Sequence, residues 1–326
     1  MKNLFYLLIF TLLIACGGKT KKASTHTEPE VSNTPLQWLT FNKDSKKTKH
    51  IVMISGDEEY RSEEALPQLA KILSKHHGFK CTVLFAQKED NPGIIDANYG
   101  NNIPGLEALK TADMMVVFTR FRALPDNQMQ HIDDYLKTGK PVIGIRTATH
   151  AFNFGKNDSL SNFKHYSNGY NGDKTAWKGG FGRLILGEKW ISHHGQHKHQ
   201  STLGIIPENA QSHPITNGIK SGDVWGSTDV YGVRLPLPDD SQPIILGQVM
   251  NRKGEYDGND IFYGMKHTDD EIATTNKKGE NLNDPMMPVS WTKSYMVPGG
   301  KKGKVFTTTV GVATDMLIEG TRRLLV

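Results

Sequence analysis

The stretch PVIGIRTATHAF, Pro141 to Phe152, predicts a buried strand that runs into a tight turn and then a helix. In many α/β enzymes such a turn carries a Ser or Cys nucleophile, whereas here the corner residue is Arg146. A guanidinium stays protonated at biological pH and has no lone pair with which to attack. Its fork of donors suits the recognition of hydroxyls, a carbonyl or an anion instead.

Strands and helices alternate before this stretch. Three apolar runs have the length of strands: HIVMIS (50–55), KCTVLFA (80–86) and MMVVFT (114–119). A helical face from Leu66 to Leu73 follows the first run, and a helix over 125–138 follows the third. Pro67 predicts that regular helix begins near it, with Arg61 to Glu64 in the approach turn. This pattern predicts an α/β fold with a mainly parallel sheet covered on both faces.

The second half of the chain is less regular. Five short strands are predicted among loops rich in Gly, Asn and Lys: RLILG (183–187), TLGII (202–206), PIILGQV (243–249), PVSWTK (288–293) and KVFTTTVG (304–311). Asp315 to Val326 predicts a helix that stops while still apolar and without a cap, as in a truncated chain. Residues 37–326 are predicted to form one domain with elaborated loops.

The first residues differ from the rest. The apolar run from Leu4 to Ala15 is too short to span a bilayer and fits the core of a signal peptide. Its last residues and Cys16 resemble a bacterial lipobox, in which the cysteine is acylated; the alternative is an ordinary signal with a chance cysteine. Residues 1–16 thus predict a lipoprotein signal, and 17–36 a flexible tether. We expect a lipid-anchored protein of the bacterial cell envelope.

Charge and cysteine content bear on the partners and the covalent cross-links that this protein can have. The net charge of +5 is spread along the 326 residues without a long basic run, which gives nucleic-acid binding little support. Cys81 is the only cysteine besides Cys16, so the mature domain cannot hold an internal disulfide. The sequence leaves the oligomeric state open.

Polar residues follow several predicted strands. Because ligands of parallel sheets bind beyond the carboxyl ends of the strands, we expect these side chains to converge. The alternative is that they cap helices and pair with one another; for Thr147 in particular, capping competes with a role in the site. The candidates after the first run are Asp57, Glu58, Glu59, Tyr60 and Arg61, and those after the third run are Arg120 and Arg122. Arg146, Thr147, Thr149 and His150 follow PVIGI, and Gly311, Thr314 and Asp315 follow KVFTTT.

The order of several motifs resembles the trehalose-utilisation (ThuA-like) family from about Lys49 to the end. The motifs are ISGDEEYRSEEALPQLAKIL, FTRFRALPDNQMQHIDDYLKTGKPVIGIRTATHAF, GGFGRLILGEKWISHHGQH, HPITNGI, STDVYGVRLPLP and VFTTTVG. The resemblance extends more distantly to class I glutamine amidotransferase-like folds, and implies a flavodoxin-like three-layer sandwich. In those amidotransferases a nucleophilic Cys follows the strand, at the position of Arg146 here, which excludes cysteine-dependent glutamine hydrolysis.

The stretch WISHHGQHKHQ contains four histidines within seven residues: His193, His194, His197 and His199. His193 and His197 have metal-ligand spacing if helical, but Ser192, Gly195 and Gln196 favour a loop. The resemblance implies that His193 or His194 faces the pocket, and that an acidic-Tyr segment corresponds to Asp229-Val230-Tyr231, where the family usually has Asp-Glu. We expect no firmly bound cofactor, and at most a weak divalent metal at His193, His194 and Asp229.

The resemblance implies an enzyme that acts on a sugar or keto-sugar in disaccharide use; hydrolysis, lyase cleavage and isomerisation stay open. His150 or His194 is expected to be the general acid/base, because the pKa of histidine lies near the working range, with Asp57 or Asp229 orienting it. The residues expected to hold the substrate are Arg120, Arg122, Arg146, Thr147, Tyr60, His193 and Tyr231.

The alternative is a carbohydrate-binding lipoprotein without catalysis. It accounts for the tether, for the lack of a nucleophile and for the aromatic residues Tyr60, Trp177, Trp190, Trp225 and Tyr231. Two histidines within hydrogen-bond reach of an acid in the pocket favour the enzyme, and a shallow aromatic platform without such a pair favours the binder.

Overall fold

The computed structural model describes residues 36–42, 48–155 and 161–326. The predicted lipoprotein signal, Cys16 and nearly all of the predicted tether lie outside the described residues. None of the helices within these ranges combines the length and the apolar character needed to span a membrane.

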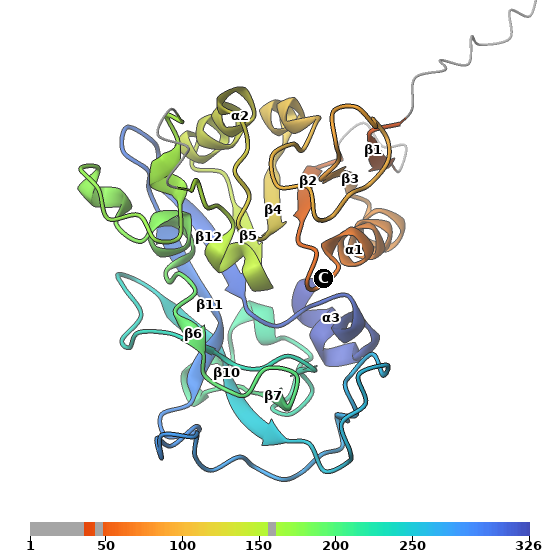
Figure 1. Cartoon of the computed structure of the whole chain (residues 1–326), viewed down its shortest axis with the longest axis vertical. Coiled ribbons are helices and arrows are strands. Elements are labelled where there is room, and N and C mark those ends of the chain that lie inside the picture. Colours follow the sequence, from red (N-terminus) through yellow and green to blue (C-terminus); the bar gives the residue numbers. More distant parts are fainter. Residues whose placement is uncertain (1–35, 43–47, 156–160) are drawn as a thin grey trace, which may run out of the picture. The chain divides into compact units, whose positions relative to one another are not determined.

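The described domain is built on a mixed ten-stranded sheet with the order β1-β3-β2-β4-β5-β12-β11-β10-β7-β8 (Figure 1). Its strands are β1 (Trp38–Phe41), β2 (His50–Gly56), β3 (Lys80–Phe85), β4 (Met114–Thr119), β5 (Val142–Ile145), β7 (Gln200–Ile205), β8 (Trp225–Gly226), β10 (Gln242–Asn251), β11 (Met287–Tyr295) and β12 (Gly303–Thr308). A separate pair joins β6 (Ser192–His193) to β9 (Tyr231–Gly232). The α-helices are α1 (Ser62–His77), α2 (Asp126–Lys137) and α3 (Glu319–Leu325).

The parallel part of the sheet confirms the α/β pattern of the sequence. Strands β3, β2, β4, β5 and β12 pair in parallel. Numbered by their sequence among these five, they lie in the sheet in the order 2-1-3-4-5. The order reverses beside β2, which makes a switch point at the carboxyl ends of β2 and β4. Both strands are followed there by the polar residues that the sequence singled out.

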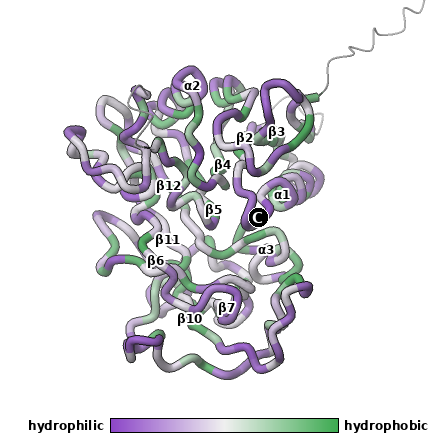
Figure 2. Tube along the Cα trace, in the orientation of Figure 1, coloured by the Kyte–Doolittle hydropathy of each residue, from purple (hydrophilic) through white to green (hydrophobic). Residues whose placement is uncertain are grey.

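Each face of this parallel part has its own core. Along β2, Val52 and Ile54 lie in the core that contains α2, whereas Ile51 and Met53 lie in the core that contains α1. Leu325 of α3 joins the α1 core. This division follows from the alternation of side chains along a strand. Hydrophilic and hydrophobic colours alternate along α1 and α2 in Figure 2, as expected for helices with one buried side.

The other half of the sheet is antiparallel. Strands β11, β10, β7 and β8 continue from β12 in alternating directions, so the sheet is mainly parallel only in its first half. The long loops of the second half connect these strands. The sequence predicted β7, β10 and β11 but not β8, and it gave no sign of their direction.

One predicted strand is a helical turn. The first four residues of RLILG belong to a π-helix over Gly182–Leu186, in which Ile185 and Leu186 are buried. A Cβ on Gly182 would lie 2.1 Å from the Thr149 carbonyl oxygen, so only glycine permits this close approach. A short apolar run does not distinguish a strand from a buried helical turn, which is why the prediction was wrong.

Three helical boundaries also differ from the sequence-based expectation. Helix α1 begins at Ser62, five residues before Pro67, so Ser62 to Glu64 are helical and only Arg61 stays in the turn, with a left-handed φ of 55°. A 3-10 helix over Arg146–His150 follows β5. At the end of the chain, Ile318 is extended and separates a 3-10 helix over Thr314–Leu317 from α3.

Candidate functional site

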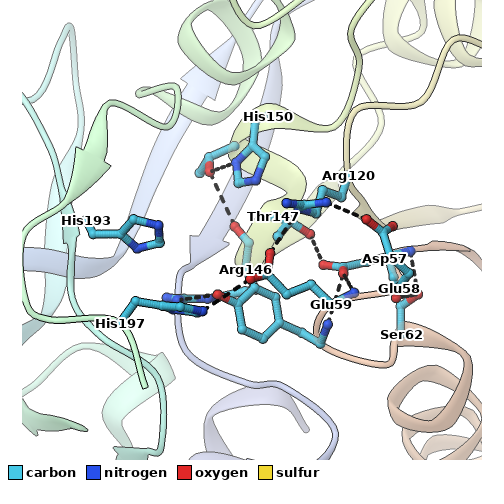
Figure 3. Close-up of polar contacts among 12 residues, drawn as sticks. Asp57, Glu58, Glu59, Ser62, Arg120, Arg146, Thr147, His150, His193 and His197 are labelled. Carbon is cyan, nitrogen blue, oxygen red and sulfur yellow. Dashed lines mark hydrogen bonds and ion pairs between the residues drawn. The ribbon is translucent and has the colours of Figure 1, made fainter. Parts of the chain in front are cut away.

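The turns after the parallel strands meet at one edge of the sheet, as predicted. Asp57 and Glu59 follow β2, Arg120 follows β4 and Arg146 follows β5. Figure 3 shows these side chains together with His197, which comes from the loop before β7. The site is therefore assembled from both halves of the sheet.

Arg146 is an internal anchor of the site. Its side chain is fully buried, and its Nη1 donates to the carbonyl oxygens of Asp229 (3.0 Å) and Thr309 (2.8 Å). Its Nη2 donates to Tyr60 Oη (3.1 Å) and Asp229 Oδ1 (3.2 Å). The guanidinium carbon lies 3.6 Å from the centre of the Tyr231 ring. These partners occupy both Nη atoms, and the buried Nε has no hydrogen-bond partner among the described residues, so Arg146 orders the loops around it and is not placed to hold a substrate.

Asp57 and Thr147 also stabilise the turns at this edge of the sheet. Asp57 Oδ1 accepts from the backbone N–H groups of Glu59 (2.7 Å) and Tyr60 (3.0 Å), and Oδ2 accepts from the Thr147 hydroxyl. Burial raises the pKa of Asp57, while these hydrogen bonds oppose the rise. The structure thus ties Asp57 to the turn after β2, where it does not contact a histidine.

The two arginines after β4 differ in burial and in their partners. Arg122 is buried and donates to the carbonyl oxygens of Gly56 and Tyr99 and to Glu58, so it closes the turn. Arg120 is partly exposed; its Nη1 donates to Glu58, and its Nε lies 3.0 Å from Glu59 Oε2. Arg120 is thus the more exposed of the two arginines.

A chain of histidines and carboxylates lies beside Arg120; we call Glu59, His193, His197 and Asp229 the histidine–carboxylate cluster. His193 Nδ1 is 2.7 Å from Asp229 Oδ2, and His197 Nδ1 is 3.0 Å from Asp229 Oδ1. The other ring nitrogen of His197, Nε2, lies 3.3 Å from Glu59 Oε1. Two imidazoles therefore share one buried carboxylate, and one of them connects it to a second carboxylate.

The charges within the cluster depend on one another. Burial opposes ionisation of Asp229, but hydrogen bonds from the two histidines and the charge of Arg146 hold its pKa below the usual range. Hydrogen bonds to Asp229 and Glu59 raise the pKa of His197 to about 9. The hydrogen bond from His197 lowers the pKa of Glu59. In this arrangement the imidazole of His197 is protonated and lies between the carboxylates of Asp229 and Glu59.

A cavity of about 320 Å³ opens next to the cluster. Glu59 and His197 line it on the cluster side. Most of the other lining side chains are polar or charged: Glu58, Tyr60, Arg61, Lys198, Ser227, Thr228, Asn259, Asp260, Tyr263 and Thr314. Ile261 and Val312 add apolar surface.

His194 does not join the cluster. Its Nε2 is 2.8 Å from the Leu282 carbonyl oxygen, and it lines a second hollow with Gln196 and Glu280. His193 also lines this second hollow, but only His193 contacts Asp229, so His194 does not contribute to the cluster. His197 takes the place that the sequence assigned to His194, because the turn after β6 brings it back beside His193.

His150 is buried beneath aromatic rings. Its ring centroid lies 4.7 Å from that of Phe121 and 5.5 Å from that of Trp190, and its Nδ1 is 3.3 Å from Thr149 Oγ1. Burial lowers its pKa to about 3, and the charges of Arg120 and Arg146 add to this effect. His150 is therefore neutral at physiological pH and does not line the cavity.

We expect this buried imidazole to make the fold sensitive to acid. His150 takes up a proton near pH 6.5 when unfolded and only near pH 3 when folded, so its contribution to stability is present above 6.5 and is lost as the pH falls toward 3. Between pH 7.5 and 5 the loss is about 2 kcal/mol. Arg120, Arg146 and His193 lower the pKa of His150, and Glu59 raises it.

Urea unfolding of the wild type and of His150→Gln at both pH values measures this loss. The variant removes the titrating group, so its stability should fall less between the two pH values than that of the wild type. Equal losses in the two proteins would contradict the assignment.

The aromatic residues do not form an open platform. Tyr60, Trp177, Trp225 and Tyr231 are buried in the domain. Trp190 is partly exposed and packs beside His150 and His193. Aromatic side chains thus form part of the frame around the cluster.

No protein-family model matches this chain, and no curated protein matches it. Among solved structures it is similar to proteins named as ThuA-like from Parabacteroides merdae (14% identity, TM-score 0.47, 86% of this chain and 88% of that one) and from Bacteroides uniformis (14%, 0.45, 87% and 89%). A third similar structure is the exo-β-1,4-mannosidase Op5Man5 from Opitutaceae bacterium strain TAV5 (7%, 0.29, 83% and 32%). These likenesses are too remote to carry an argument about the chemistry of the site.

Proposed function

We propose that this chain is a ThuA-like enzyme that acts on a sugar or keto-sugar in disaccharide or glycoside use, with the histidine–carboxylate cluster as its reactive centre. The motif order in the sequence supports the family, and the 2-1-3-4-5 order of the parallel strands supports a flavodoxin-like three-layer arrangement. The cluster lies at the carboxyl edge of that sheet, where such folds bind their ligands.

The observation that carries the proposal is the connected series Asp229–His197–Glu59. Asp229 fixes the ring of His197 through Nδ1, and Nε2 faces Glu59. Because Glu59 and His197 both line the cavity, a sugar hydroxyl bound there can exchange a proton with this pair. We therefore place the acid/base role on Glu59 and His197 rather than on His150 and His194.

The cavity suits a small polyol. Its volume of about 320 Å³ is at the lower end of the range for ligand sites, roughly 300–1,000 Å³. Ser227, Asn259 and Asp260 offer donors and acceptors for hydroxyl groups. Arg120 does not line the cavity but lies 3.0 Å from Glu59 Oε2, and its charge helps to keep Glu59 ionised.

The geometry favours an enzyme over a carbohydrate-binding protein. His193 and His197 are both within hydrogen-bond reach of Asp229, and of these three residues His197 lines the cavity, which supports a catalytic site. The aromatic side chains that a binding platform requires are mostly buried. We also propose that acylation of Cys16 anchors the enzyme in the cell envelope; a Cys16→Ser chain that stays wholly with the membrane fraction would contradict the anchor.

Incubation of the purified chain with 3-keto-disaccharides and with ordinary disaccharides, followed by mass spectrometry, tests the activity. We expect conversion of at least one of these compounds, and the mass of the product distinguishes hydrolysis, elimination and isomerisation. If every compound remains intact, the enzymatic proposal fails for this class of substrates.

A further inference from the structure

In the described domain, the side chains of His193, His197 and Asp229 are arranged so that they could hold a metal ion. We call them the triad. Each residue offers one ligand atom, and these atoms lie within 4.8 Å of one another. Both histidine contacts to Asp229 are made by Nδ1, at 2.7 and 3.0 Å. A tetrahedral metal with bonds of roughly 2.0–2.1 Å separates its ligand atoms by about 3.3 Å. Small rotations of the two rings would therefore bring three ligand atoms around one cation.

The carboxylate of this triad is held in place before any ligand arrives. Asp229 is buried, and Arg146 donates to its backbone oxygen and to its Oδ1. Carboxylates that bind metals are typically hydrogen-bonded in this way by outer groups. The anchoring of Asp229 thus keeps its remaining oxygen directed at His193.

An outer carboxylate is also present on the far side of His197. Histidines that bind metals almost always give their other ring N–H to a carboxylate, a carbonyl or water, which fixes the tautomer. Glu59 Oε1 lies 3.3 Å from His197 Nε2 and meets this requirement. A cation would displace the proton from Nδ1, the atom that contacts Asp229, while Nε2 keeps its N–H toward Glu59. Arg120 in turn lies 3.0 Å from Glu59 Oε2, so the outer group is itself held.

The third ligand leaves the site accessible. The side chain of His193 is 41% exposed, whereas those of His197 and Asp229 are 28% and 0% exposed. A cation held by two imidazoles and one carboxylate would have at least one coordination position open for water or a substrate oxygen, as in catalytic metal sites. Imidazole nitrogen favours zinc, iron and similar ions over magnesium and calcium, which prefer oxygen ligands.

We infer that His193, His197 and Asp229 form a binding site for a first-row transition-metal dication, with Glu59 as the outer-shell partner of His197. We expect this site to bind metal more tightly than the weak His193, His194 and Asp229 site expected from the sequence. The reason is that His197 supplies a ligand atom and its tautomer is fixed by Glu59. The inference shares His197 with the proposed function. The proton path to Glu59 runs through Nε2, so a cation at Nδ1 leaves it in place.

Titration of the full chain, stripped with EDTA, with Co²⁺ tests the site without any sugar. We expect one Co²⁺ per chain with visible absorption bands that Zn²⁺ abolishes by competition and Mg²⁺ leaves unchanged. His193→Gln and His197→Gln should each weaken Co²⁺ binding by more than the roughly 10- to 100-fold that loss of an outer partner costs. His194→Gln, which alters the neighbouring ring outside the triad, should bind Co²⁺ like the wild type.

Either of two results would overturn the inference. One is the absence of saturable Co²⁺ and Zn²⁺ binding to the wild type, and the other is wild-type affinity in both His193→Gln and His197→Gln. Circular dichroism and unfolding midpoints of each variant show whether a loss of binding reflects a loss of fold. Because sugar is absent from this titration, its outcome is independent of whether the chain converts a disaccharide.

Discussion

Replacement of Arg146 by methionine is expected to lower the free energy of unfolding by about 3–5 kcal/mol, the usual cost of removing one partner from a buried ion pair. Methionine fills much of the volume but leaves the buried Asp229 carboxylate without its arginine and leaves the Thr309 carbonyl without a donor. Urea unfolding monitored by circular dichroism measures the loss. Arg146→Lys keeps the charge but not the fork of donors, so an intermediate loss is expected.

Arg323→Ala is the matched control for this prediction. Arg323 forms an exposed ion pair with Glu319 four residues before it, at 2.7 Å, and such pairs contribute about 0.5 kcal/mol or less. A loss below about 1 kcal/mol for Arg146→Met would contradict the role of Arg146 as an anchor.

Glu59→Gln is expected to lower the turnover of a converted disaccharide by about 10²- to 10⁴-fold, the usual contribution of a general acid or base. The amide keeps the size of the side chain but cannot accept a proton as the carboxylate does. Glu59 is partly exposed at the cavity wall, so the fold should be retained. Rates measured by mass spectrometry at saturating substrate, together with the unfolding midpoint, separate the two effects.

The control for Glu59→Gln is Glu208→Gln, an exposed residue outside the site, which should turn over substrate like the wild type. Co²⁺ titration of Glu59→Gln distinguishes the proton-transfer role from metal binding: Co²⁺ affinity should fall by only about 10- to 100-fold, since Glu59 is not a ligand. Unchanged turnover in Glu59→Gln would remove Glu59 from the proposed reaction, whether or not the metal binds.

The first half of the fold was predictable because its strands are buried on both faces. HIVMIS and MMVVFT are apolar without interruption, and β2 and β4 begin at the same residues as these runs. The direction of β10 and β11 was not predictable, because their side-chain pattern is compatible with either direction. Leu184 and its neighbours looked like a strand because the contacts that fold them into a π-helix come from distant residues such as Trp291.

The site was predictable only in part, for a similar reason. The convergence of Asp57, Arg120 and Arg146 follows from the rule that parallel strands end at one edge. The selection of His197 over His194 depends on the turn over residues 194–200, whose shape a single sequence does not give. The spacing of four residues between His193 and His197 was the usable signal, although a turn and not a helix brings the two rings together.

The position of β12 has a consequence for the order in which a newly made chain can fold. β12 lies between β5 and β11, and Val305 pairs with Val142 although more than half of the domain separates them in sequence. Until residues 303–308 have left the ribosome, β5 presents an unpaired apolar edge that invites aggregation. Arg146 also lacks its acceptor on Thr309 until then. The histidine–carboxylate cluster therefore reaches its final arrangement only after residues 303–309 have been made, and a chaperone that covers β5 until then would protect the nascent chain from aggregation.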